Sequence, residues 1–234
     1  MADVSVPTEA AGDPADGIGR RLAALRGDRR VRVTDLAREV GVSPSLISQI
    51  ERGQSRPSVS TLFALSQALG VPVDAFFRED APEAPGGPDG PDRPEGPGVP
   101  DAAAAPAGQA ESRYVVRRGD RASIDIEGGV RWERLTPATL RDLDFLELVY
   151  GPHAESNPTL YTHPGVEMVL MMTGTLEIHV GFERYRLKAG DSMHFPSSMP
   201  HRYVNPAGTT SRAVTVIVHD GAGAVDTGRP PPRP

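Results

Sequence analysis

The sequence predicts two domains, an all-α domain of five short helices and an all-β barrel, joined by a proline- and glycine-rich linker. Helical periodicity is confined to residues 17–77, and ten short β-type runs occur within 113–220. The chain has 25 Gly and 24 Pro among 234 residues, about a fifth of the whole, well above average usage. These residues concentrate in 78–112, the predicted linker, and we expect disordered tails at 1–16 and 221–234.

Composition excludes several classes of protein. The chain has no Cys, so it has no disulfide scaffold, no Cys-ligated zinc site and no thiol nucleophile. It has no apolar run near the roughly 20 residues of a membrane span, and its first residues lack the features of a signal peptide. We therefore expect a soluble, cytoplasmic protein that does not enter a membrane.

Charge is distributed unevenly along the chain. Residues 17–77 contain nine Arg and five acidic side chains, a balance of +4, which leaves −10 for the rest of a chain whose net charge is −6. A small basic domain on an acidic protein favours an anionic partner for that domain. The alternative is that these arginines form an ordinary solvated face.

The first two helices follow from caps and apolar spacing. Ile18, Leu22 and Leu25 recur at the spacing of one helix face. Thr34 is expected to cap a second helix, which ends at Gly41 because glycine readily takes the left-handed conformation found there.

The third helix begins at Ser43, a good N-cap, with Pro44 at the first helical position. It is expected to run to Gly53 with Ile47 and Ile50 pointing inward. Only a short glycine-containing turn separates it from the second helix, which is typical of a helix-turn-helix that presents the later helix to the DNA major groove.

The remaining helices complete the domain. Ser58 is expected to cap a fourth helix that ends at Gly70. Residues 71–77 are expected to form a short fifth helix that closes the core. The inward residues of the fourth helix are Val59, Leu62, Phe63, Leu65 and Leu69.

The outward face of the third helix carries the chemistry of base recognition. Gln49 has an amide that can bond adenine bidentately, and Ser45 can bond several base edges. Arg52 and Arg56 lie just past the helix, where they would meet phosphates. Helix-turn-helix pairs also occur as plain packing units, which is the alternative. The predicted DNA-binding residues are Thr34, Pro44, Ser45, Ser48, Gln49, Arg52, Gln54, Ser55 and Arg56.

The run LAREVGVSPSLISQIERGQSRPSVSTLFALSQALGVPVDAFF closely resembles the DNA-binding domain of the XRE/Cro transcription regulators. The resemblance covers about 60 residues and is most specific in SxxISQIERGxxxPS and LxxALGVPVxxFF. It implies a dimer that reads a two-fold operator with half-sites about one helical turn apart. It also implies that Glu51 is structural and pairs with Arg26, so both are excluded from the base-reading residues.

Prolines recur at every third position between residues 82 and 100. Polyproline II has about three residues per turn, so these prolines would line one ridge of a stiff spacer. A PxxP ligand for a partner domain is the alternative, without flanking residues that would make it specific. We expect the spacer to keep the helical domain away from the mouth of the barrel.

The sequence pattern of the C-terminal half predicts β-strands. The run TLEIHV alternates, with Leu176, Ile178 and Val180 on one face. Ten short runs without a helical period favour an all-β sandwich or barrel. These runs are YVVRR, ASIDI, VRWERL, LDFLELVY, VEMVLMM, TLEIHV, FERYRL, SMHFP, HRYVN and AVTVIVH.

Two segments of the barrel carry candidate ligands. His163 and Glu167 lie four residues apart at the start of one strand, and His201 follows a proline. Two imidazoles and one carboxylate suit a mononuclear divalent metal, iron, manganese, nickel or zinc, with open positions. The alternative is a polar lining for an organic ligand. The other histidines discussed, His153, His179 and His194, are expected to be structural or exposed.

These segments resemble the two cupin motifs. His163, Glu167 and Gly174 match the second half of the first motif, with Tyr161 in place of its first histidine. The resemblance implies a double-stranded β-helix barrel with Tyr161, His163, Glu167 and His201 in one ligand pocket. A three-ligand site of His163, Glu167 and His201 remains compatible with this pattern. The second motif is matched by Gly190, Pro196, His201 and Asn205, with Ser198 in place of its glycine.

Two functions follow from these patterns. The first is a transcription regulator, not an enzyme, whose cupin domain forms a homodimer and senses a small molecule. The second is a metal-dependent oxygenase or epoxidase that carries a repressor-like domain, because the phosphonate epoxidases resemble this pairing of modules. The outward face of the third helix favours the regulator.

Overall fold

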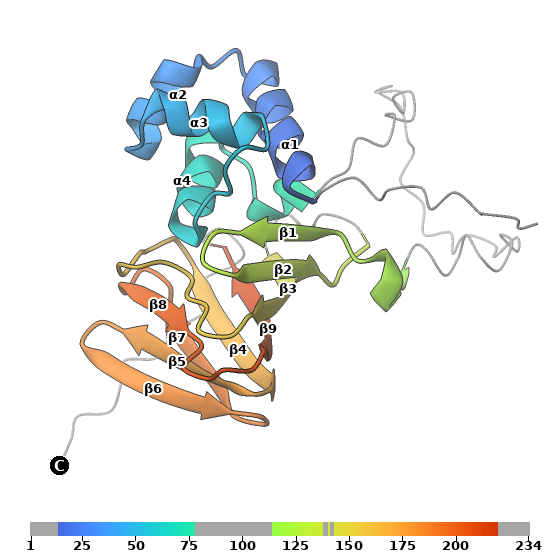
Figure 1. Ribbon diagram of the computed structural model, residues 1–234, viewed down its shortest axis with the longest axis vertical. Coiled ribbons are helices and arrows are strands. Elements are labelled where there is room, and N and C mark those ends of the chain that lie inside the picture. The colour runs from blue at the N-terminus through green and yellow to red at the C-terminus, as the bar shows by residue number, and fades with distance from the viewer. Residues whose placement is uncertain (1–13, 78–113, 138–139, 141–142, 220–234) are drawn as a thin grey trace, which may run out of the picture.

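The computed structural model describes residues 14–77, 114–137, 140 and 143–219. The predicted linker at 78–112 and the predicted C-terminal tail at 221–234 lie outside the described residues. The N-terminal region is helical, and the C-terminal region is built of antiparallel strands (Figure 1). Among the helices that the structure describes, none is both long enough and apolar enough to cross a membrane.

Four α-helices form the N-terminal region, not five. They are α1 (Pro14–Asp28), α2 (Val33–Val40), α3 (Pro44–Glu51) and α4 (Val59–Leu69). The predicted fifth helix is a 3-10 helix, η1 (Val73–Phe77), because the Ala75 amide donates to the Pro72 carbonyl three residues earlier.

Two boundaries of these helices differ from the prediction. The first helix begins at Pro14, three residues before the predicted start of the domain. Thr34 is not a cap, because Arg32 has the extended backbone of the N-cap position and Thr34 lies inside the first turn of α2. The Arg32 side chain makes no capping hydrogen bond there.

The other predicted caps are confirmed. The Ser43 hydroxyl accepts a hydrogen bond from the Leu46 amide at 3.1 Å, and the Ser58 hydroxyl accepts one from the Thr61 amide at 3.2 Å. Gly41 and Gly70 end α2 and α4 with φ angles of 77° and 60°, which glycine adopts without strain. The helix boundaries are thus set by local chemistry.

Nine strands form the barrel, and the predicted run at 114–118 is not one of them. That segment leads into a 3-10 turn, η2 (Arg118–Asp120), and most of its side chains are exposed, so it has no apolar face to bury. The strands are β1 (Ser123–Ile126), β2 (Val130–Arg134), β3 (Leu143–Tyr150), β4 (Val166–Thr173), β5 (Thr175–Val180), β6 (Glu183–Lys188), β7 (Ser192–Pro196), β8 (His201–Val204) and β9 (Ser211–Val218).

The strands make two antiparallel sheets. The larger has the order β1-β2-β3-β9-β4-β7, and the smaller has the order β6-β5-β8. Leu176, Ile178 and Val180 of β5 are buried, as their alternation predicts. The two sheets face each other (Figure 1). Buried side chains from both sheets meet between them, as Tyr203 of β8 and Glu167 of β4 do.

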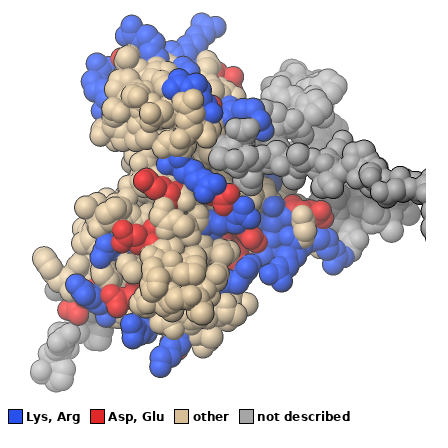
Figure 2. Space-filling view, viewed as in Figure 1, with Lys and Arg blue, Asp and Glu red and all other residues tan. Residues whose placement is uncertain are grey.

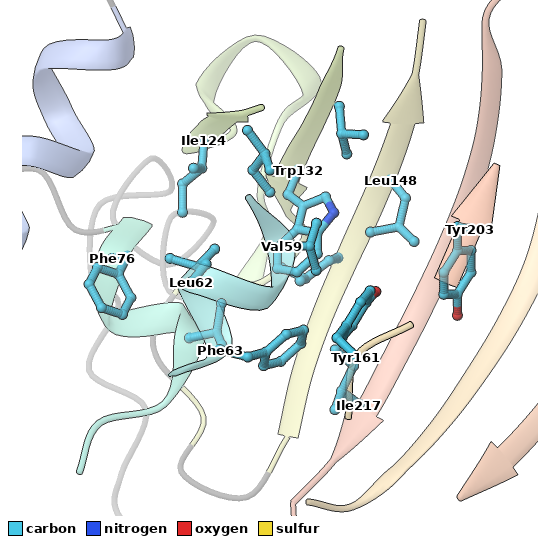
Figure 3. Close-up of a cluster of buried hydrophobic side chains, with 14 of the residues drawn as sticks. Val59, Leu62, Phe63, Phe76, Ile124, Trp132, Leu148, Tyr161, Tyr203 and Ile217 are labelled. Atoms are coloured by element: carbon cyan, nitrogen blue, oxygen red, sulfur yellow. The ribbon is translucent and has the colours of Figure 1, made fainter. Parts of the chain in front are cut away.

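The helical region packs directly against the barrel, which overturns the expectation that the linker separates them. Buried side chains of α4 and η1 continue into the core of β1, β2 and β3 (Figure 3). Phe63 of α4 lies 5.8 Å from the ring of Trp132 in β2, in an edge-on arrangement. The apolar side chains of α4 thus pack against the barrel as well as within the helical core.

Polar contacts reinforce this junction. The Glu127 amide donates to the Pro57 carbonyl at 3.0 Å, and the Ser60 hydroxyl donates to Asn157 Oδ1 at 2.9 Å. At the opposite end, Arg134 of β2 pairs with the buried Asp74 of η1 at 3.3 Å. Since removing one partner of a buried ion pair leaves the other charge uncompensated, the Arg134–Asp74 pair favours the docked arrangement.

Candidate functional site

The helix-turn-helix presents α3 as predicted. Ile47 and Ile50 are completely buried, whereas Ser45 and Gln49 on the other face are exposed. The remaining predicted DNA-binding residues are exposed, except that Ser48 and Ser55 are half-buried. The exposed members of that remainder are Thr34, Pro44, Arg52, Gln54 and Arg56.

Three of the predicted DNA-contacting residues already interact with other side chains of this protein. The Arg52 guanidinium donates to Gln54 Oε1 at 3.0 Å, which orients both side chains beyond the end of α3. Arg56 lies 3.8 Å from Asp125 of β1, so it also joins the helical region to the barrel. Figure 2 shows basic side chains projecting from the outer end of the helical region, away from the barrel.

A partly buried ion pair supports α3 from behind. Arg26 of α1 donates to both carboxylate oxygens of Glu51, at 2.6 and 3.1 Å, and to the Val31 carbonyl at 2.9 Å. The hydrogen bond that Arg26 donates to the Glu51 carboxylate raises the pKa of Arg26, which therefore stays charged. The structural role expected for Glu51 is confirmed, and its carboxylate is not available to DNA.

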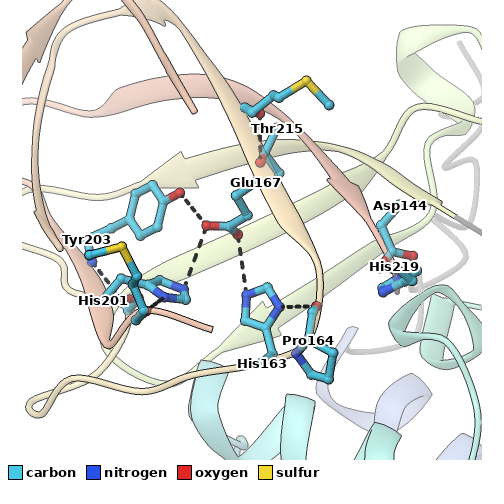
Figure 4. A network of polar contacts seen from close by, with 11 residues as sticks. Asp144, His163, Pro164, Glu167, His201, Tyr203, Thr215 and His219 are labelled. Carbon is cyan, nitrogen blue, oxygen red and sulfur yellow. Dashed lines mark hydrogen bonds and ion pairs between the residues drawn. The ribbon is translucent and has the colours of Figure 1, made fainter. Parts of the chain in front are cut away.

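Inside the barrel, three side chains converge from β4, from β8 of the facing sheet and from the loop before β4. His163 Nε2 lies 3.7 Å from Glu167 Oε1, and His201 Nε2 lies 3.7 Å from Glu167 Oε2 (Figure 4). All three side chains are buried, and one ligand atom from each lies within 4.8 Å of the others. The structure thus brings together His163, Glu167 and His201, hereafter the triad.

The imidazoles of the triad are oriented by backbone carbonyls. His163 Nδ1 donates to the Pro164 carbonyl at 3.3 Å, and His201 Nδ1 donates to the Met199 carbonyl at 2.8 Å. These bonds place the proton on Nδ1 and leave the Nε2 lone pair of each ring directed into the barrel. Both Nε2 atoms are buried and lack a hydrogen-bond partner in the structure.

Electrostatics prepares the triad as a set of ligands. Burial lowers the pKa of His201, so this imidazole is neutral near pH 7. Burial alone would raise the pKa of Glu167, but His163, His201 and the Tyr203 hydroxyl outweigh it and hold that pKa below its ordinary value. A neutral His201 imidazole beside the ionised Glu167 carboxylate has the protonation states that binding of a divalent metal requires of these two residues.

The triad fits a divalent metal. Two buried nitrogen lone pairs without partners and one carboxylate form the mixed nitrogen and oxygen set that suits iron, manganese, nickel or zinc. A bound ion would supply a Lewis-acidic centre with open positions for an oxygen-donor ligand. His163, Glu167 and His201 would hold it.

Tyr161 lies beside the triad but is not a member of it. Its backbone pairs with that of His201 through two hydrogen bonds, at 3.0 and 2.9 Å, and its ring lies 4.5 Å from the His201 ring. Burial raises the pKa of Tyr161 well above its ordinary value, so it remains a neutral phenol. Its ring lies next to the rings of both histidines of the triad.

Two residues of this site were missed from the sequence. The Tyr203 hydroxyl donates to Glu167 Oε2 at 2.7 Å, and the alternation of β8 could have indicated it, since Tyr203 is two residues after His201. Phe63 stacks on the His163 ring with centroids 3.8 Å apart and 8° between the planes. No local signal indicates Phe63, because helix periodicity marks it only as buried.

The other histidines lie outside the triad. His179 contacts Glu177 at 2.6 Å, and His153 and His194 are exposed, which agrees with their predicted structural or exposed roles. His219 contacts the buried Asp144 at 2.9 Å. Asn205, a cupin-motif residue, is fully buried and donates to three backbone carbonyls. Its side chain therefore holds neighbouring backbone segments together and does not hydrogen-bond to the triad.

Comparison with known proteins divides the chain in the same way. The helix-turn-helix family matches residues 22–76, and the cupin domain family matches residues 146–224. HTH-type transcriptional regulator PuuR of Escherichia coli K12 is 23% identical over 197 residues, which cover 84% of this chain and 92% of that protein. Uncharacterized HTH-type transcriptional regulator y4dJ of Sinorhizobium fredii is 37% identical over 54 residues, 23% of this chain and 70% of that protein.

One solved structure resembles the whole arrangement. An HTH_3 family transcriptional regulator from Vibrio cholerae has a TM-score of 0.56 at 19% identity, over 88% of this chain and 96% of that chain, which shows a shared fold. The chain spans only 44% and 57% of the lengths of two further relatives.

Proposed function

Because the chain belongs to the XRE-type helix-turn-helix transcriptional regulators that carry a cupin domain, we propose that it binds a specific operator through α3 and senses a small molecule through the triad. The proposal of DNA binding rests on the two faces of α3. Ile47 and Ile50 are buried on one face, whereas Ser45 and Gln49 are exposed on the other. The helix can therefore enter the major groove without disturbing the core.

The roles of the side chains follow from their chemistry. Gln49 would bond a base edge through its amide, with Ser45 beside it near the start of the helix. Arg52 and Arg56 would contact phosphates, which position the helix on the duplex without specifying its sequence. The contact between Arg56 and Asp125 means that the barrel adjoins this surface.

Substitution of Gln49 by alanine is expected to reduce the preference for the operator over random DNA by about 10- to 100-fold. Truncation removes the bidentate amide but leaves the phosphate contacts, so binding to random DNA is expected to change little. Fluorescence anisotropy with an operator selected from a random duplex library measures both affinities at one salt concentration.

The matched control for this experiment is Gln67→Ala, since Gln67 is an exposed amide on α4 rather than α3. It is expected to leave the preference unchanged. An unaltered preference in Gln49→Ala would remove Gln49 from the base-reading surface, and no affinity for any duplex at low salt would refute the regulator.

The cupin domain is proposed to hold a divalent metal at the triad and a small-molecule effector next to it, in the pocket that Tyr161 also lines. The support is that the buried Nε2 atoms of His163 and His201 lack a hydrogen-bond partner and face the ionised carboxylate of Glu167. An effector acts on transcription only if it binds two arrangements of the regulator with different affinities.

We also propose that a second copy of this chain covers the outer face of β4. Met168, Leu170 and Met172 point outward there and are about half exposed, beside Val214 and Val216 of β9. A hollow of about 510 Å³ lies between these residues and β7, and none of its lining residues is Asp, Glu, Lys or Arg. Contiguous apolar surface of this kind marks an interaction site.

A second copy suits this face better than another partner. The chain carries a net charge of −6, so like surfaces repel unless they meet where charge is missing, as it is here. Projecting methionine and leucine side chains next to a hollow also make the face self-complementary, which a two-fold interface requires. Such a dimer would hold two copies of α3 for a two-fold operator.

Substitution of Leu170 by glutamate is expected to convert the dimer to a monomer and to weaken operator binding, because it places two carboxylates in an apolar interface. Analytical ultracentrifugation gives the mass, and anisotropy gives the affinity. Phe182→Glu, at a fully exposed turn, is the control and should remain dimeric. A dimer that survives Leu170→Glu would place the interface elsewhere.

A further inference from the structure

Phe63 of the DNA-binding region covers the triad of the sensing domain on one side. Phe63 projects from α4 toward the barrel (Figure 3). Its ring lies flat against the ring of His163. Phe63 is 4% exposed and also lies 6.2 Å from the ring of Tyr161. The ring therefore touches both the triad and the pocket wall, although it belongs to the other domain.

The contact leaves little room at the triad. A centroid separation of 3.8 Å is van der Waals contact, so no molecule fits between Phe63 and His163. The side chains of the triad are almost completely shielded from solvent. A ligand that approaches His163 from this side must first displace the Phe63 ring.

The structure provides a place for the displaced ring. A hollow of about 350 Å³ lies at the junction of the two domains, lined by Phe63, Gln67 and Val71 on the helical side and by His163 and Pro164 on the barrel side. Movement of the Phe63 side chain into this hollow would uncover His163. A larger shift would move α4 away from the barrel.

Movement of α4 would affect the surface that faces DNA. The start of α4 is joined to the barrel by the Ser60–Asn157 hydrogen bond, and the segment just before it carries Arg56, which pairs with Asp125. Helix α4 also packs against α2 of the helix-turn-helix. A change at Phe63 therefore has a short physical path to the DNA-binding surface.

We infer that Phe63 is a gate that couples occupancy of the triad to the docking of the DNA-binding domain on the barrel. With the ring against His163 the domains are docked and the triad is closed; an occupied triad favours the displaced ring and a loosened junction. Coupling of this kind is reciprocal, so operator DNA that favours one arrangement changes the affinity of the triad in the same proportion. This inference rests on the proposed function of the triad as a sensor.

Access to the triad can be measured without a metal or an effector. Diethyl pyrocarbonate modifies accessible imidazole nitrogens, and peptide mass spectrometry gives a rate for each histidine of the full chain. His163 is expected to react at least ten-fold faster in Phe63→Ala than in the unsubstituted chain, while exposed His153 reacts equally in both. Phe63→Leu, which keeps an apolar side chain at the gate, is expected to lie between them.

Equal rates at His163 in all three proteins would overturn the gate. So would a His163 in the unsubstituted chain that reacts as fast as His153. A general acceleration at His201 and His179 in Phe63→Ala would indicate that the variant is unfolded, in which case the rate in Phe63→Leu decides the question. None of these outcomes depends on DNA binding, so failure of the gate is distinguishable from failure of the regulator.

The coupling itself has an internal reporter. Trp132 is the sole tryptophan of the chain, and its ring contacts Phe63, so its fluorescence reports on the junction. Titration with Co²⁺ is expected to shift the Trp132 emission in step with the visible absorbance of the bound ion, and the shift is expected to be lost in Phe63→Ala. Absorbance of bound Co²⁺ without a change in Trp132 emission would overturn the coupling. No Co²⁺ absorbance would refute the metal site, and the rates of histidine modification would then decide whether Phe63 is a gate.

Discussion

Substitution of His201 by alanine is expected to abolish the stabilisation of this protein by divalent metal. In the unsubstituted chain, a metal at about 100 times its dissociation constant adds about 2.7 kcal/mol to the free energy of unfolding, which corresponds to about 5–10 °C in melting temperature. His201 would supply one of the three ligands, and its Nε2 atom has no hydrogen-bond partner in the structure. Loss of a partner that merely orients a ligand costs about 10- to 100-fold in metal affinity, so loss of the ligand itself is expected to cost more than 100-fold.

Differential scanning fluorimetry with Fe²⁺, Mn²⁺, Ni²⁺ and Zn²⁺, together with metal analysis of the purified protein, measures this effect. Glu167→Gln is a second test that keeps the shape of the side chain but removes its charge. His153→Ala, at an exposed position, is the control and should keep the full shift. If no metal co-purifies and none raises the melting temperature of the unsubstituted chain, the triad lines an organic pocket instead.

Substitution of Glu51 by alanine is expected to destabilise the DNA-binding domain by about 3 kcal/mol. It would leave the partly buried Arg26 guanidinium without the two hydrogen bonds that it donates to the carboxylate. Because this pair joins α1 to the end of α3, its loss also disturbs the recognition helix. Urea denaturation followed by far-ultraviolet circular dichroism gives the change in the free energy of unfolding.

The control for Glu51 is Asp35→Ala. Asp35 also pairs with arginines, Arg32 and Arg38, but on an exposed surface where water screens the interaction. It is expected to change the urea midpoint little. If the two variants shift the midpoint equally, burial of the Arg26–Glu51 pair contributes nothing beyond an ordinary surface contact.

The structure also changes how the two halves of the protein are expected to communicate. A stiff spacer between separate domains would restrict the barrel to holding two DNA-binding domains together. Direct packing of α4 on the barrel instead places Phe63 of one domain against His163 of the other. An event at the triad therefore reaches the DNA-binding domain through contact and does not require transmission along residues 78–112.

The sequence by itself determined the features that depend on neighbours along the chain. The caps at Ser43 and Ser58 and the buried face of α3 follow from hydrogen bonds and apolar spacing within a few residues. The four-residue spacing of His163 and Glu167, together with the resemblance to the cupin motifs, likewise predicted His163, Glu167 and His201 as one group. The 3-10 form of η1 was not predictable, because helix type in so short a segment depends on packing.

Only the tertiary structure decided which surfaces the buried side chains cover. Apolar periodicity marked Phe63 as a core residue, but it does not distinguish burial within a domain from burial against a neighbouring one. The hydrogen bond from Tyr203 to Glu167 likewise joins residues of different sheets. Docking of the helical region on the barrel depends on two complementary surfaces from distant parts of the chain, so no local sequence pattern predicts it. The physical reason is that the hydrophobic effect is non-directional. Which surface an apolar side chain covers is therefore decided by how closely the two surfaces pack.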